Sequence, residues 1–267
     1  MLPIDALTTD EAKSLHGLLF DLDDTLLDRG RLMEAAYSAL FRLNEVGLKL
    51  YAVTGRPSGW GELLVRQWPI TGAVTENGAV CVHREGELVR RVDSAEPGER
   101  RDRRARIAML VSDMRSRFPE LAPADDVDAR ISDFTFDIGE RRHLPVEVVD
   151  RAADFAREQG FRTTRSTVHL HVTLDGDDKA SGTVRLIRAL HGTDATVARL
   201  RHAFIGDSEN DQACFAAFPT SIAVKNLTGR PTVRPRFVTR GERAAGFVEA
   251  AGVLVSRRTP GVSGPPK

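Results

Sequence analysis

The sequence has 267 residues and a balanced charge, with 38 Lys and Arg residues against 38 Asp and Glu residues. Hydrophobic residues make up 41% and charged residues 28%, which is typical of a globular protein and excludes a disordered or fibrous chain. The zero net charge argues against a nucleic-acid or membrane partner held by bulk electrostatic attraction. The length suits one large domain or two modest ones.

Neither the cysteines nor the first residues indicate an exported protein. Cys81 and Cys214 are too few for a disulfide framework, and both stand among apolar neighbours. Residues 1–13 carry acids where a signal peptide would carry a basic stretch and then an apolar run. No window approaches the ~20 apolar residues of a membrane span. We therefore expect a cytoplasmic protein with buried, inert thiols.

Apolar, β-rich runs alternate with helical patterns near both ends of the chain. Three runs end abruptly in polar residues: 17–20 before Asp21, 48–53 before Thr54, and 202–205 before Gly206-Asp207. Helical patterns cover residues 32–46, 59–68, 180–190 and 212–218. This alternation predicts an α/β fold with a parallel sheet. Ligands bind such sheets at the carboxyl ends of the strands, which is where the polar residues fall.

The middle of the chain is richer in charged residues and interrupts this alternation of strands and helices. Charges crowd residues 83–106, and an amphipathic helical pattern follows them. We expect a strand over 131–138, a helix over 146–159, and one or two strands over 161–174. The predicted organisation is a core in two parts, 1–82 and 169–256, an inserted smaller α/β domain at 83–168, and a disordered tail at 257–267.

Two motifs follow the first predicted strands. Asp21 and Asp23 are separated by one residue, so both can project into one loop and divide the roles of nucleophile and general acid/base. The alternative is a cluster of helix N-caps. Thr54-Gly55 offers a hydroxyl group, backbone N–H groups and room for a phosphate oxygen, although Thr-Gly is also an ordinary strand-to-loop junction.

Two further motifs lie in the last third of the chain. Lys179 is one of only five lysines, and a compact cation suits a phosphate group, but an exposed loop would explain it equally well. Asp207 and Asp211, four residues apart after a predicted strand, can converge on a hard cation with oxygen ligands in the manner of Mg²⁺.

The ordered set Asp21-x-Asp23, Thr54, Lys179 and Gly206-Asp207…Asp211 resembles the signature of the haloacid dehalogenase superfamily of phosphotransferases. Many members carry glycine at the position of Asp24, and this difference does little to weaken the resemblance. The resemblance implies a Rossmann-like core with a parallel sheet and an inserted α/β cap domain. The long interval before Lys179 looks like the type-IIB branch, which includes Cof-type, sucrose-, trehalose- and mannosyl-3-phosphoglycerate phosphatases and phosphomannomutases.

The resemblance also implies a role for each motif. Asp21 would attack phosphorus and become an aspartyl phosphate, while Asp23 would protonate the leaving alcohol and then activate water. Thr54, Gly55 and Lys179 would hold the phosphoryl oxygens.

A Mg²⁺ ion would complete the implied site. Its ligands would be the Asp21 carboxylate, the backbone carbonyl of Asp23, and Asp207, with Asp211 in support. A cation is needed because two like charges at ~4 Å repel each other by roughly 4 kcal/mol at an effective dielectric near 20. Phosphoryl transfer depends mostly on positioning and charge stabilisation.

Residues that contact the substrate are harder to predict. In the strand 131–138, Asp133, Thr135 and Asp137 share one face, and Phe134 and Phe136 share the other. The polar face either binds sugar hydroxyls or faces solvent, and solvent is the simpler expectation. The candidates for substrate contact are Arg56, Asn77, Asn210, Arg130, Asp133 and Asp137.

The favoured function is Mg²⁺-dependent hydrolysis of a small phosphomonoester, most simply a sugar phosphate. The expected partner is a small phosphorylated metabolite, without nucleic acid or membrane, and the oligomeric state stays open. A sugar phosphomutase similar to phosphomannomutase uses the same motifs. A catalytically silent binding protein on the same fold is the alternative from another class.

Overall fold

The computed structural model describes residues 1–166, 168–229 and 232–259. They form two compact units. Of the described residues, the first unit contains Met1–Ala52, Trp68–Thr71 and those from Ile187 onward, and the second contains Val53–Gln67 and those between Gly72 and Leu186. Within the described residues, no helix combines the length and the apolar character of a membrane span.

The first unit is built on a parallel sheet. Its strands run in the order β1 (Leu2–Pro3), β15 (Phe237–Val238), β14 (Thr220–Ala223), β13 (His202–Gly206), β2 (Gly17–Phe20) and β5 (Lys49–Val53). Every residue of β2, β13 and β14 is buried, which explains why β2 and most of β13 read as apolar runs without polar alternation. The predicted α/β fold class is confirmed.

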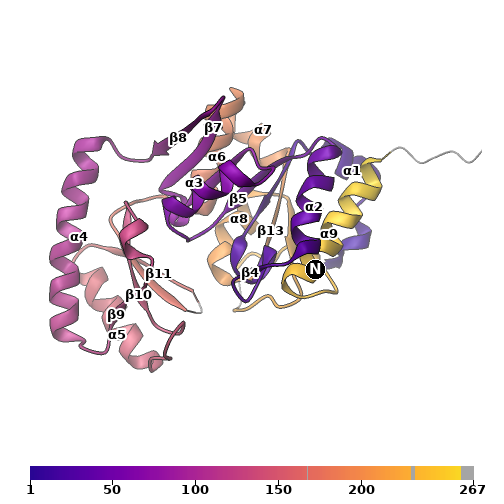
Figure 1. Ribbon diagram of the computed structural model, residues 1–267. Coiled ribbons are helices and arrows are strands. Elements are labelled where there is room, and N and C mark those ends of the chain that lie inside the picture. The colour runs from indigo at the N-terminus through magenta and orange to yellow at the C-terminus, as the bar shows by residue number, and fades with distance from the viewer. Residues whose placement is uncertain (167, 230–231, 260–267) are drawn as a thin grey trace, which may run out of the picture. The chain divides into compact units, whose positions relative to one another are not determined.

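Helices and short hairpin strands complete the first unit. α1, α2 and α9 pack against one another (Figure 1). α2 buries Ala36, Leu40 and Leu43, which recur at helical spacing on one face. The bounds are η1 (Ile4–Ala6), α1 (Thr9–Ser14), η2 (Leu22–Leu26), β3 (Leu27–Asp28), β4 (Arg31–Leu32), α2 (Glu34–Glu45), α7 (Ala195–Leu200), η5 (Glu209–Asp211), α8 (Gln212–Ala217) and α9 (Arg243–Arg258).

α9 includes Arg257 and Arg258, the first residues of the expected tail. Residues 260–267, over which the tail was predicted to be disordered, lie outside the described residues.

The second unit contains an antiparallel group of strands. β6 (Gly72–Thr75), β7 (Val80–Glu85) and β8 (Leu88–Asp93) pair in this order. α3 (Ser58–Gln67) packs on β6 and β7. η3 (Glu76–Gly78) lies between β6 and β7, and α6 (Lys179–His191) begins in this unit.

A second antiparallel sheet in this unit has a hydrophobic core of its own. Its order is β11 (Arg162–Arg165), β12 (His169–Thr173), β10 (Asp133–Asp137) and β9 (Ala122–Pro123). α4 (Pro97–Arg117) and α5 (Val146–Glu158) contact the sheet and each other (Figure 1); η4 spans Val127–Ala129. Ile107, Met114, Phe136, Val149 and Leu170 belong to the core. The inserted-domain limits 83–168 stay a prediction.

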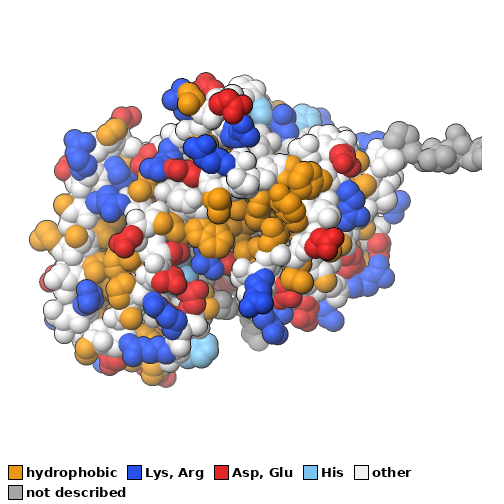
Figure 2. Space-filling view, in the orientation of Figure 1, with side chains coloured by type: hydrophobic (Ala, Val, Ile, Leu, Met, Phe, Trp, Pro, Cys, Tyr) orange, Lys and Arg blue, Asp and Glu red, His pale blue; other side chains and the backbone are white. Residues whose placement is uncertain are grey.

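The surface agrees with the balanced composition. On the face drawn in Figure 2, positive and negative side chains of the described residues are interspersed, and neither sign forms a continuous field. Both cysteines are buried, and burial raises the pKa of the Cys81 thiol to about 11. Cys81 is therefore an unreactive thiol at neutral pH, as its apolar neighbours indicated.

One buried histidine lies at the start of β13. His202 is 3% exposed, its Nδ1 lies 2.8 Å from the backbone oxygen of Ala198, and its ring packs over Gly17. Burial, with a smaller effect of the nearby His16 and His191, lowers the pKa of His202 to about 4, against the hydrogen bond to Ala198. Folding therefore favours the neutral imidazole.

The stability of the chain should depend on pH through His202. The imidazole of His202 takes up a proton near pH 6.5 in the unfolded chain and near pH 4 in the folded one. Its contribution to the free energy of unfolding is therefore full above pH 6.5 and is lost as the pH falls to about 4. The loss amounts to roughly 3 kcal/mol at 1.36 kcal/mol per pKa unit. Urea unfolding of His202→Asn should show a flatter pH dependence than the parent chain. His83→Asn, on β7, is the control and should leave the slope unchanged; an equal slope in His202→Asn would contradict the assignment.

Candidate active site

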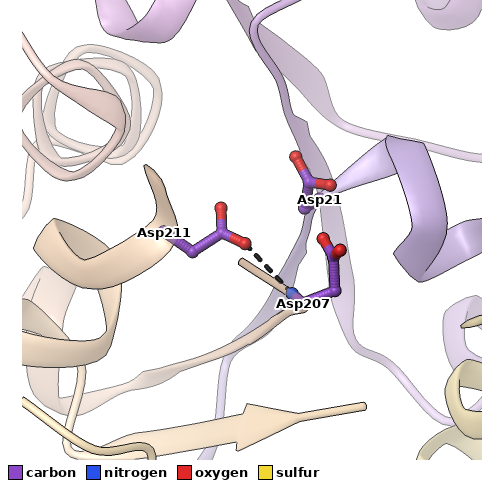
Figure 3. Close-up of side chains that lie close together, drawn as sticks. All are labelled: Asp21, Asp207 and Asp211. Carbon is purple, nitrogen blue, oxygen red and sulfur yellow. Dashed lines mark hydrogen bonds between the residues drawn. The ribbon is translucent and has the colours of Figure 1, made fainter. Parts of the chain in front are cut away.

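Three buried carboxylates meet at the carboxyl ends of two adjacent parallel strands. Asp21 follows β2 directly, and its N–H donates to the carbonyl of Ile205 at 3.0 Å. Asp207 follows β13, and Asp211 ends the short helix η5. Each of the three offers an oxygen, and these oxygens lie within 4.8 Å of one another (Figure 3). The sheet register thus brings together residues that are 186 positions apart in the sequence.

Backbone donors and a glycine fix the position of Asp211. Its Oδ2 accepts hydrogen bonds from the N–H of Asp207 at 3.1 Å and of Ser208 at 3.3 Å (Figure 3). A Cβ atom at Gly206 would overlap this carboxylate, so only glycine permits the close approach. The Thr25 hydroxyl donates to Asp207 Oδ1 at 3.2 Å. The sequence motifs alone do not predict these contacts of Thr25 and Gly206.

Asp23 and Asp24 lie in η2, the turn that follows Asp21. Asp23 is half-buried, and its side chain is outside the group of three carboxylates; the resemblance assigned its backbone carbonyl to the metal. Asp24 has φ 56°, a left-handed conformation that favours glycine. The side-chain amide of Asn226 donates to the Asp24 carbonyl at 3.0 Å, and Arg243 Nε donates to its carboxylate at 3.0 Å. These contacts hold the turn in its strained conformation.

The chemistry of the three carboxylates fits Mg²⁺. All the donor atoms are hard oxygens from buried side chains, and Mg²⁺ is held by few carboxylates together with oxygen atoms of substrate and water. Without a cation, each pair of negative charges at ~4 Å would cost roughly 4 kcal/mol at an effective dielectric near 20. Asp21, Asp207 and Asp211 are therefore suited to hold a divalent cation.

The loop after β5 lies in the second unit and is held by backbone hydrogen bonds. Thr54 is buried, and its N–H donates to the carbonyl of Val74 at 2.8 Å. Its hydroxyl oxygen accepts from the N–H of Arg56 at 3.0 Å, and its carbonyl accepts from the N–H of Asn77 at 3.2 Å. A Cβ at Gly55 would lie 3.0 Å from Asn77 Oδ1. The structure thus groups Thr54, Gly55, Arg56 and Asn77.

Lys179 is the first residue of α6 and is 2% exposed. The exposed loop that was one reading of this lysine is therefore wrong. The start of α6 packs so closely on Gly78 that a Cβ at Gly78 or Gly182 would overlap the backbone of the other segment. The packing of α6 against the turn after β6 therefore fixes the position at which the Lys179 side chain is buried.

The polar face of β10 is not solvated, contrary to our expectation. Asp133 is 9% exposed, Thr135 0% and Asp137 3%. Burial alone would raise the pKa of Asp133, but the Arg130 guanidinium and His171 hold it below its usual range. Asp137 accepts from the backbone N–H groups of residues 139–141. The partners on this face are Arg130 and residues 139–141, which are close in the sequence, and His171 on β12, and the alternation within one strand does not predict any of them.

The remaining candidates are placed as follows. Arg56 stacks on Trp60, with its guanidinium carbon 4.8 Å from the ring centroid, and lies 3.9 Å from the Asp126 carboxylate. Asn210 accepts from the Ser208 hydroxyl at 2.7 Å in η5. Arg130 is 1% exposed and forms bonds within the second unit.

Comparison with known proteins gives a family for the first part of the chain. Residues 18–96 match the model for haloacid dehalogenase-like hydrolases, and this range contains Asp21, Asp23 and Thr54. Over these residues the chain is similar to haloacid dehalogenase-like hydrolases. The resemblance that the motifs indicated is confirmed, and with it the class of hydrolases. No curated protein matches the chain.

Solved structures share the fold over almost the whole chain. A Thermoplasma acidophilum protein, 0175, is 20% identical, with a TM-score of 0.71 over 90% of this chain and 98% of that one. The sucrose-phosphatase of Synechocystis sp. PCC6803, in complex with sucrose and phosphate, is 17% identical, with a TM-score of 0.66 over 90% and 98%. A sugar phosphatase of haloacid dehalogenase subclass IIB is 20% identical, with a TM-score of 0.62 over 89% and 99%. At these identities the likeness shows the fold.

Mg²⁺ should stabilise this chain, because the ion relieves the repulsion among Asp21, Asp207 and Asp211. Saturating MgCl₂ should raise the midpoint temperature of thermal unfolding. At a hundred times its Kd, the ion should add ~2.7 kcal/mol to the free energy of unfolding. In Asp207→Asn the increase should be smaller by more than half. Asp113→Asn, the same change of charge at an exposed position of α4, is the control. An equal Mg²⁺ response in both variants would contradict a metal site at the three carboxylates.

Proposed function

We propose that the chain is a Mg²⁺-dependent phosphatase that hydrolyses a small phosphomonoester, with a sugar phosphate as the preferred class of substrate. The observation that carries the proposal is the convergence of Asp21, Asp207 and Asp211 at the carboxyl ends of β2 and β13. Because three carboxylates repel one another and a phosphate dianion, a nucleophilic carboxylate in this group needs a cation beside it. The same cation would favour the attack on the phosphate dianion.

In this proposal Asp21 attacks phosphorus through a carboxylate oxygen, the P–O bond to the alcohol breaks, and an aspartyl phosphate forms. Asp23 donates a proton to the leaving oxygen and later accepts one from the water that hydrolyses the aspartyl phosphate. Thr54, Gly55 and Lys179 hold the phosphoryl oxygens. Lys179 brings positive charge, and Thr54 and Gly55 bring a hydroxyl and a backbone amide.

Asp21, the backbone carbonyl of Asp23, Asp207 and Asp211 would hold the Mg²⁺ ion. When bound, the ion offsets the negative charge that Asp21 and the phosphate bring together. The firm position of Asp211, which the N–H groups of Asp207 and Ser208 hold, supports a fixed geometry of these ligands.

Sugar phosphates are proposed because the neighbours in fold are described as a sucrose-phosphatase and a subclass IIB sugar phosphatase. Residues 83–168 are proposed as the cap that selects the substrate, with Asn77, Arg56, Asn210, Arg130, Asp133 and Asp137 as candidate contacts. The two buried thiols support a place in the cytoplasm.

Asp21→Asn should abolish turnover, because an amide oxygen is a poor nucleophile. We expect kcat with p-nitrophenyl phosphate and Mg²⁺ to fall on the order of a thousand-fold or more. The thermal midpoint should stay or rise, since one of three repelling charges is removed. Asp10→Asn, an exposed carboxylate on α1, is the matched control and should retain full activity. Activity near that of the parent chain in Asp21→Asn would refute the proposed mechanism.

The substrate class is tested by phosphate release from a panel of sugar phosphates, phosphoglycerate glycosides, nucleotides and cofactor phosphates. Release that is fastest with sugar phosphates supports the proposal. A hexose 1-phosphate that yields hexose 6-phosphate without free phosphate would identify a mutase instead. No release from any member of the panel would favour a binding protein on this fold.

A further inference from the structure

A buried arginine lies behind the loop that carries Thr54. Arg130 is 1% exposed, and its Nη1 donates to the backbone carbonyl of Gly55 at 3.0 Å. Its Nε and Nη2 donate to the two carboxylate oxygens of Asp126 at 3.0 and 3.1 Å. Burying a guanidinium is costly unless it is paired and hydrogen-bonded, so a contact with Gly55 inside such a set of bonds is firmly held.

Residues of the β9–β12 sheet hold Arg130 in turn. Arg130 Nη1 lies 3.1 and 3.2 Å from the carboxylate oxygens of Asp133 on β10. Asp133 Oδ2 is bonded to Nδ1 of His171 on β12 at 2.9 Å, and the same nitrogen lies 3.2 Å from the Thr135 hydroxyl. Burial lowers the pKa of Arg130, but Asp133 and Asp126 raise it above its ordinary value, so the guanidinium stays charged.

A single peptide group links this guanidinium to the Thr54 hydroxyl through one hydrogen bond at its carbonyl and one at its N–H. In a trans peptide the C=O and N–H groups point in opposite directions. The carbonyl of Gly55 accepts from Arg130, and the N–H of Arg56, in the same peptide, donates to Thr54 Oγ1 at 3.0 Å. Because Oγ1 accepts this bond, the hydroxyl proton of Thr54 is not used in it and can be donated to a different acceptor.

Glu76 holds the neighbouring backbone of the same loop. Its Oε1 accepts from the N–H of Ser58, at the start of α3, at 2.9 Å. Its Oε2 accepts from the N–H of Ser132 at 2.6 Å. Burial raises the pKa of Glu76, and the negative charge of Asp133 raises it further, against the hydrogen bonds of Ser132 and Ser58. Arg130 therefore acts on a loop whose other end is already fixed to the segment before β10.

We propose that Arg130 is a positioning residue for phosphate binding. It fixes the Gly55–Arg56 peptide, and this peptide orients the Thr54 hydroxyl as a hydrogen-bond donor to a phosphoryl oxygen. The inference rests on the proposed function, in which Thr54 contacts the phosphoryl group. It assigns Arg130 and Asp133 to the support of the phosphate-binding loop and removes them from the candidates for direct contact with the sugar.

A double-mutant cycle tests this relay. Arg130→Lys should lower kcat/KM for p-nitrophenyl phosphate by ~10-fold in the parent chain and by less than ~2-fold in the Thr54→Val background, because the hydroxyl that Arg130 orients is already absent. Thr54→Ser, which keeps a hydroxyl, should restore most of the dependence on Arg130. An equal loss in both backgrounds would mean that Arg130 supports only the fold, and would overturn the proposal.

Arg141→Lys is the matched control for this cycle. Arg141 also bonds a buried carboxylate, that of Asp137 at 3.1 Å, and a backbone carbonyl, that of Pro123 at 2.7 Å. It should lower kcat/KM by less than ~2-fold in either background. If Arg130→Lys does not fold, Arg130→Gln, a smaller neutral donor, enters the same cycle under the same criterion.

Hydrogen exchange of the Arg56 amide separates the relay from the proposed function. In Arg130→Lys or Arg130→Gln this amide should exchange ~10-fold faster, while the Thr54 amide, bonded to Val74, keeps its rate. Unchanged exchange would overturn the relay whether or not the chain is a phosphatase. Faster exchange in a chain that releases no phosphate from any substrate would retain the relay and refute the phosphatase.

Discussion

Like charges held at short range constrain the whole first unit. Asp21 and Asp207 become neighbours only because β2 and β13 are adjacent and parallel, and Asp211 joins them because residue 206 lacks a side chain. The backbone donors of Asp207 and Ser208 offset part of the negative charge, and the apolar strands beneath keep water away. The three carboxylates therefore repel one another at this edge of the sheet. A divalent cation would bind there favourably because it would relieve that repulsion.

The second unit treats buried charge in the opposite way. Around Arg130, positive and negative groups alternate, so that Asp126 and Asp133 are each paired within the unit. Charges that are compensated internally hold a loop in place, whereas charges of one sign attract something from outside. The second unit thus pairs its buried charges internally, whereas the first unit gathers three carboxylates at one edge of its sheet.

The sequence is informative wherever chemistry depends on local spacing. The strand 17–20 and the four-residue interval between Asp207 and Asp211 are visible without a structure, because apolar runs and short intervals determine local geometry. Pairings between distant segments are not visible in this way. Asp133 on the polar face of β10 is bonded to His171, which lies 38 residues further along the chain, and the alternation of a single strand cannot predict which of its faces another element covers.

The left-handed turn at Asp24 links two distant parts of the chain. A glycine there would adopt φ 56° without strain, but it would lose the contact between its carboxylate and Arg243 at the start of α9. Arg243 itself has φ 49°, so both partners occupy a backbone region that side chains rarely adopt. Each residue is tolerated because the other is present. The contact between Asp24 and Arg243 therefore joins the turn after β2 to the start of α9, and Asp24→Gly would exchange this contact for a relaxed backbone.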